Sequence, residues 1–251
     1  MMTRRQGITM PPRPPLGWPP DDTEESVLGT NLHQATITNL RVGLNEVAAA
    51  LAPPGQAAPW QALSQTIIRN FRRRDGSRYK TLPDVFVYRQ AIDERRKSLS
   101  VETDGPPVLI VESLSDSTHD VDLNLMDGKG YSYAHAGVRE YLILDPTGEF
   151  MPERGQGWRL HDGVYRPWLP DEQGRWQSQE IAAAIGLEGV HVVVYTSDGR
   201  RQLREGEIAR ELARLDAELA RRDAELAALR RLLEQRNEDP EDPDDPEETL
   251  S

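Results

Sequence analysis

Val108-Leu-Ile-Val-Glu-Ser-Leu114 is a run of apolar and β-branched residues typical of a buried strand, and it contains one acid, Glu112. A second such run, Pro83-Asp-Val-Phe-Val-Tyr88, contains Asp84. A carboxylate in a buried strand is costly to desolvate unless its charge is compensated. A divalent cation held between the two carboxylates would compensate both, and would make the pair a catalytic site. The alternative is that each acid lies at a strand end, in water, where it caps a loop.

The surrounding sequence predicts a mixed α/β fold. Apolar residues at three- and four-residue spacing predict an amphipathic helix from His33 to Leu51. A second helix is expected at 124–136, with Gly137 as its C-terminal cap. Strands are expected at 62–71, 84–89, 108–114, 140–144 and 191–195, with others in the tryptophan-rich stretch 158–176. This order of elements can place two acids side by side at one sheet edge.

The C-terminal region reads as a separate helical unit. Its apolar residues alternate three- and four-residue steps, with Arg222 interrupting one position: Ile208, Leu212, Leu215, Leu219, Leu226, Leu229 and Leu233. Such heptads with charged flanks predict a coiled coil and a homo-oligomer through residues 203–236. The alternative is one amphipathic helix that folds back onto the domain.

Composition and charge distinguish the two ends of the chain from the main domain. The net charge of the 251 residues is −12, but residues 237–251 hold eight acids and no base, which leaves 30 bases and 34 acids elsewhere. This tail is expected to be disordered, and the proline-rich residues 1–28 are expected to form a flexible arm. The main domain is expected at 29–202.

The chain has no cysteine, which excludes disulfides and zinc-thiolate sites. Without an apolar stretch long enough for a signal peptide or membrane span, a cytoplasmic bacterial protein is expected.

Several motifs follow one another in a recognisable order. They are Pro83-Asp84, Glu112, Ser115-Asp116-Ser117-Thr118, Lys129, Tyr133, Gly137-Val138-Arg139-Glu140-Tyr141 and Asp145-Pro146. This order resembles the Uma-two family of bacterial endonucleases, which belongs to the restriction-endonuclease-like PD-(D/E)XK superfamily. Weaker similarity extends back to Gly29-Thr30-Asn31-Leu32-His33-Gln34 and forward through about residue 200. The resemblance implies a restriction-endonuclease-like mixed sheet flanked by helices, and magnesium- or manganese-dependent hydrolysis of phosphodiester bonds in DNA.

The resemblance also implies roles for single residues. Asp84 and Glu112 would bind the metal ion, with the backbone carbonyl of Ser113 as a third ligand. The superfamily lysine usually stands two residues beyond the second acid, but that position is Leu114 in this chain. An apolar residue at this position is common in the Uma-two family. Lys129 is the substitute candidate; the alternative is an ordinary surface lysine.

A further departure concerns a position near Lys129. Family members commonly keep an aspartate four residues before the lysine, where this chain has Leu125. Glu46 on the first predicted helix could approach the metal, but its spacing is more typical of a solvated helix charge.

A cluster of six bases just before Asp84 is the candidate nucleic-acid contact: Arg69, Arg72, Arg73, Arg74, Arg78 and Lys80. Such a cluster could neutralise phosphates without reading sequence, or it could be a solvated hairpin. The histidines lack metal-site spacing and are interpreted as surface or satisfied polar residues. A competing hypothesis is a catalytically inactive nuclease-fold protein that binds or assembles through its coiled coil.

Overall fold

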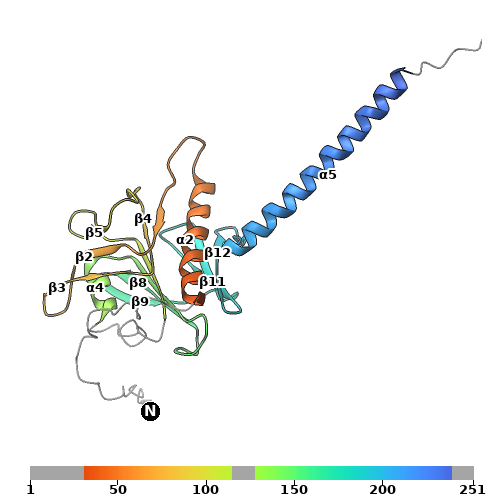
Figure 1. The fold of residues 1–251 in the computed structure, drawn as a ribbon. Helices are drawn as coiled ribbons and strands as arrows, with labels where there is room; N and C mark the ends of the chain where they lie inside the picture. Colours follow the sequence, from red (N-terminus) through yellow and green to blue (C-terminus); the bar gives the residue numbers. More distant parts are fainter. Residues whose placement is uncertain (1–30, 115–127, 239–251) are drawn as a thin grey trace, which may run out of the picture.

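A computed structural model describes residues 31–114 and 128–238 of the chain (Figure 1). The predicted N-terminal arm, the acidic tail from residue 239 and the segment that contains Leu125 lie outside the described residues. Within the described part, no helix combines the length and apolar character needed to cross a membrane. The first helix, α2, spans Asn31–Leu51, close to its prediction.

A six-stranded mixed sheet forms the centre of the domain. Its strands, in spatial order, are β1 (Gln61–Leu63), β4 (Val85–Tyr88), β6 (Leu109–Ser113), β7 (Glu140–Leu144), β8 (Gly155–His161) and β9 (Val164–Trp168). Strands β6 and β7 are parallel, and every other neighbouring pair is antiparallel. The two predicted acid-bearing strands are therefore direct neighbours.

Two smaller sheets cover the central one. The first contains β3 (Arg78–Thr81), β2 (Ile67–Arg72) and β5 (Ser98–Ser100) in that spatial order. The second contains β10 (Trp176–Gln177), β11 (Ala183–Glu188) and β12 (His191–Thr196). Helix α4 (Lys129–Ala136) connects β6 to β7, and Gly137 caps it at a φ of 90°, as predicted.

Alternating side chains of the central strands build two hydrophobic layers. On β6, Leu109 and Val111 join a cluster with α2, β11 and β12. Ile110 faces the other way, into a cluster with Phe71 of β2 and Tyr133 of α4. The central sheet therefore has α2 on one face and α4 with the β2–β3 hairpin on the other (Figure 1).

The predicted strand at 62–71 is wrong. The chain forms β1, turns, and then forms β2 in a different sheet. The turn contains Gln65 at a φ of 52°, a left-handed conformation that breaks strand geometry. Strands β3, β5 and β11 were not predicted, because their charged, serine-rich and alanine-rich sequences have weak strand propensity.

Helix α5 (Glu205–Glu238) extends away from the domain as a single rod (Figure 1). Ion pairs of Glu207 with Arg201 and Arg204, at 2.8 and 2.7 Å, fix its first turn. The predicted helix is thus confirmed, and the alternative that it folds back onto the domain is wrong. Pairing with a second helix stays a prediction.

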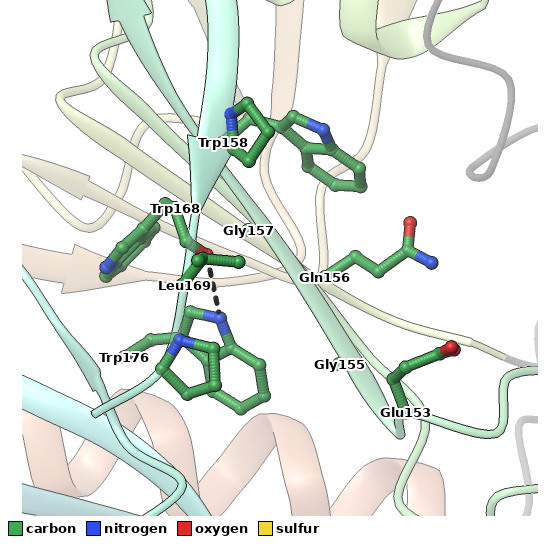
Figure 2. A pocket seen from close by; sticks show the side chains of 10 residues that line it. Glu153, Gly155, Gln156, Gly157, Trp158, Trp168, Leu169 and Trp176 are labelled. Atoms are coloured by element: carbon green, nitrogen blue, oxygen red, sulfur yellow. Dashed lines mark hydrogen bonds between the residues drawn. The ribbon is translucent and has the colours of Figure 1, made fainter. Parts of the chain in front are cut away.

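Trp168 of β9 and Trp176 of β10 pack together beside β8 (Figure 2), whereas Trp158 of β8 belongs to the other hydrophobic layer. The ring of Trp176 lies so close to Gly155 that a Cβ at this glycine would be 2.2 Å from the ring. Its indole Nε1 donates to the carbonyl of Trp168 at 3.2 Å. Together with Trp158 and Leu169 they line an apolar cavity of about 380 Å³. Neither Asp84 nor Glu112 lines this cavity.

Candidate active site

Asp84 and Glu112 lie opposite each other at one end of the β4–β6 pair. The antiparallel register pairs Val85 with Val111 and Phe86 with Ile110. One step further, the same register pairs Asp84 with Glu112. Because opposed residues of antiparallel strands project to the same face, both carboxylates lie on the α4 side of the sheet, as Ile110 does.

Hydrogen bonds connect the two acids directly. The backbone N–H of Asp84 donates to Glu112 Oε2 at 3.1 Å. The backbone N–H of Ser113 donates to Asp84 Oδ2 at 2.7 Å. The side chain of Glu112 is only 2% exposed, whereas that of Asp84 is 20% exposed. One carboxylate is therefore buried, and the other opens to the surface.

Lys129 reaches the buried acid from the first turn of α4. Its Nζ lies 3.1 Å from Glu112 Oε1, and its side chain is 18% exposed. The N-terminus of α4 adds a partial positive charge on the same side. The structure therefore places Lys129 beside the acid pair, although Leu114, at the usual superfamily position, is buried in the core.

Tyr133 contacts the same carboxylate from one turn further along α4. Its hydroxyl donates to Glu112 Oε1 at 2.9 Å and lies 3.2 Å from the hydroxyl of Thr81. Burial raises the pKa of Tyr133 well above its usual value, and the nearby charge of Glu112 raises it further. Tyr133 is therefore a neutral hydrogen-bond donor. Its four-residue spacing from Lys129, one of the motifs that carry the family resemblance, puts both on one helix face.

His33 is the residue that sequence reasoning missed. It lies in the first turn of α2, with Nε2 3.4 Å from Asp84 Oδ1 and a side chain 15% exposed. The interpretation of the histidines as surface or satisfied polar residues is therefore incomplete for His33. The stretch 29–34, which shares the weaker family resemblance, contains His33 and was a signal for it. Nothing in the sequence links His33 to Asp84, which follows 51 positions later, and only the fold brings the two together.

The chemistry of this site fits a hard divalent cation with few protein ligands. Across residues 31–114 and 128–238, no group of three or more histidines and acids is arranged to hold a metal ion. An ion at this pair would thus bind two carboxylates and complete its shell with backbone carbonyls and water. Magnesium is commonly bound in this way, because it retains several water ligands.

The six predicted DNA-contacting bases lie on the β2–β3 hairpin, which leads into Asp84. Five are exposed, and Arg73 is half-buried with its guanidinium over the ring of Tyr79. Arg72 and Arg78 are opposite each other in the hairpin and both contact Glu102, at 3.7 and 2.8 Å. Their charges are therefore partly compensated. Arg69, Arg74 and Lys80 complete the exposed set.

The other acids considered lie outside the acid pair. Glu46 is exposed on α2, in agreement with a solvated helix charge. Glu140 is buried against Arg159, with Nε and Oε1 2.9 Å apart, and accepts the N–H of Gln179 at 2.8 Å. These contacts attach the 178–181 segment to β7.

Asp145 is fully buried at the end of β7. It accepts backbone N–H bonds from Gly148, Phe150 and Met151 at 2.7–2.9 Å. Burial raises the pKa of Asp145, but these bonds and one from Thr147 outweigh burial and lower it. Glu140 and Asp145 thus stabilise loops rather than join the acid pair.

The fold and this site define a mixed α/β protein whose sheet presents paired carboxylates with a lysine. Residues 23–228 match the model of the Uma2 family, described as "Putative restriction endonuclease", and the chain belongs to this family. No curated protein matches the chain. Family membership suggests a nuclease with DNA as its substrate.

Proposed function

We propose that this protein is a metal-dependent endonuclease that hydrolyses phosphodiester bonds in DNA. The observation that carries the proposal is the convergence of Asp84, Glu112 and Lys129 at one end of β4 and β6. A buried carboxylate beside a half-buried one and a lysine is a costly arrangement for stability alone.

Asp84 and Glu112 would hold the magnesium or manganese ion. A bound divalent ion supplies an activated water and neutralises charge on the phosphate in the transition state.

The carbonyl of Ser113 is proposed as a third ligand. Its N–H points to Asp84, and the N–H and C=O of one strand residue face the same side. Pro83, opposite Ser113 in this register, has no N–H to donate to that carbonyl.

The other residues of the site would hold the two acids in position and stabilise negative charge. Lys129 could stabilise developing negative charge or orient water, since its ammonium already lies 3.1 Å from Glu112. His33 would act as a positioning residue, because its contact with Oδ1 and the Ser113 N–H on Oδ2 fix both oxygens of Asp84. Tyr133 would hold the Glu112 carboxylate in place.

DNA would lie along the β2–β3 hairpin. This hairpin ends three residues before Asp84, so phosphates bound by its exposed bases would be close to the acids. Lys80 is the nearest of them along the chain, and Arg69 lies on the adjacent strand. Such contacts predict salt-dependent binding without sequence preference.

Self-association through residues 203–236 belongs to the same proposal. The leucines of α5 are exposed over its length, which is unusual for a helix without a partner. These leucines also support the second candidate, a catalytically inactive nuclease-fold protein of the cytoplasm that assembles through its coiled coil. Leu114, in place of the superfamily lysine, favours this candidate.

Cleavage of supercoiled plasmid and of single-stranded DNA with magnesium or manganese tests the proposal. Wild type is expected to nick the plasmid, EDTA to stop the reaction, and Asp84→Ala to abolish it. Lys129→Ala should lower the rate about 10²-fold or more, the typical size for one charge-stabilising group. Glu46→Ala, an exposed acid on α2, is the matched control. Equal cleavage by all variants, or none by wild type, would favour the inactive candidate.

A further inference from the structure

An exposed apolar stripe runs along α5, outside the proposed active site. Its seven apolar side chains are between 38% and 62% exposed. In heptad terms, Leu212, Leu219, Leu226 and Leu233 occupy a positions, and Ile208, Leu215, Arg222 and Leu229 occupy d positions. The stripe therefore has one charged residue near its middle, between Leu219 and Leu226.

The glutamates that flank the stripe are neutralised within the helix. Arg214 lies 2.6 Å from Glu211, and Arg221 lies 2.9 Å from Glu225. Arg222 lies 2.8 Å from Glu218. Because each glutamate at the edge has its own arginine, the stripe does not require a basic partner. A second copy of the same helix is therefore an acceptable occupant.

A parallel pair of these helices would bring like charges together. In register, each Arg222 would lie opposite the partner's Arg222 inside the apolar seam. By the usual pairing of g and e positions, Glu211 would also face the partner's Asp216, and Glu218 would face the partner's Asp223. Only the third such pair, Glu225 with the partner's Arg230, would be attractive. Like charges placed in this way specify against an arrangement.

An antiparallel pair removes the central conflict. Ile208 then lies opposite the partner's Leu233, and Leu215 opposite the partner's Leu226, so the whole stripe is covered. Arg222 lies opposite the partner's Leu219, where its aliphatic stem can pack while its charged end stays at the edge.

The charged residues beside the stripe also make fewer repulsive contacts than in the parallel pair. By the same pairing of e positions, Asp216 comes near the partner's Arg230, whereas Asp223 comes near the partner's Asp223. Glu218 still approaches the partner's Glu225, but both already have an arginine within their own helix.

We infer that α5 forms an antiparallel dimer with a second copy of this chain. The inference deepens the self-association proposed above and rests on it. Positions 208 of the two chains would then be about 37 Å apart, at 1.5 Å per residue over the overlap. The two domains would lie at opposite ends of the rod, so the dimer is expected to nick single strands rather than make paired cuts.

The absence of cysteine makes a direct test possible, because introduced thiols have no competitor. In an antiparallel dimer, Ile208→Cys combined with Leu233→Cys should form an intermolecular disulfide under mild oxidation. Ile208→Cys alone should not. Spin labels on Leu233→Cys should give a distance near 37 Å by pulsed electron resonance. Efficient crosslinking of the single Ile208→Cys variant, or a label distance below about 20 Å, would show a parallel pair.

Light scattering on the unmodified chain completes the test. A mass of two chains is expected, and a monomer or a larger assembly would overturn the inference. Arg222→Leu removes the central charge, so it should strengthen the dimer and permit crosslinking of Ile208→Cys alone. Plasmid nicking by the same samples is scored separately, so a failure of the dimer and a failure of the nuclease proposal remain distinguishable.

Discussion

Tyr133→Phe is the most informative single substitution at the site, because it removes one hydroxyl and keeps the ring. The hydroxyl is fully buried, donates to Glu112 at 2.9 Å and contacts Thr81. The ring itself packs edge-on against Phe71 and Tyr141, with centroids 5.2 and 5.1 Å apart, and this packing should survive. A hydrogen bond to a charged group contributes about 1.5–3 kcal/mol. The variant should lose a free energy of unfolding of that size.

Urea denaturation followed by circular dichroism measures this loss. In a thermal melt, the melting temperature should fall by about 3–12 °C, since a domain of this size loses about 2–4 °C per kcal/mol. Tyr165→Phe is the matched control, since its hydroxyl donates to the neutral carbonyl of Val138 at 3.1 Å. That variant should lose only about 0.5–1.5 kcal/mol. The slope of unfolding free energy against urea should stay the same in both variants.

A double-mutant cycle with Glu112→Gln tests the cause. If the charge of Glu112 makes this hydrogen bond strong, Tyr133→Phe should cost less in the Glu112→Gln background than in wild type. An equal cost in both backgrounds, or a loss below about 0.5 kcal/mol in wild type, would refute the reasoning.

Three other perturbations test separate parts of the structure. Gly155→Ala should destabilise the domain by about 1–3 kcal/mol in urea, because a Cβ would lie 2.2 Å from the ring of Trp176; an unchanged midpoint would contradict the close contact. The pKa of Asp145 is lowered in the folded chain, so its ionised form stabilises the fold above about pH 4, and this contribution is lost as pH falls through the folded-state pKa. Asp145→Asn should therefore melt at a lower temperature than wild type at pH 7, and this difference should shrink as pH falls through the folded-state pKa of Asp145; a difference that does not change with pH would oppose this assignment. Replacing Arg69 and Lys80 with alanine should reduce the slope of log affinity for duplex DNA against log salt by about 0.9 per lost phosphate contact, and an unchanged slope would place the DNA elsewhere.

The sequence predicted the central strands well because their pattern is strong. Residues 140–144 and 109–113 are short apolar runs with one or two polar positions, which are typical of a buried strand. The capping glycine at 137 was also predictable, since helices commonly end on a left-handed glycine. The division of 62–71 into two strands was not, because it depends on a tertiary turn at Gln65 that has no glycine or proline to signal it.

The candidate site shows the same limit of local pattern. Asp84 and Glu112 stood out because an acid within an apolar run is costly to bury. Lys129 could be proposed only through the family resemblance, since one lysine on a helix has no local signature. The contact of His33 with Asp84 could not be predicted, although the resemblance includes His33, because this contact joins the start of α2 to the start of β4. Side chains that meet through tertiary packing leave no spacing to recognise.

The central claim is that Asp84 and Glu112 jointly hold one divalent ion. Calorimetric titration with manganese measures this most directly, with wild type, Asp84→Asn, Glu112→Gln and the control Glu46→Gln. One site per chain is expected in wild type and in the control, with affinity at least tenfold weaker in both acid variants. Equal affinity in all four proteins would place the metal elsewhere and contradict the account.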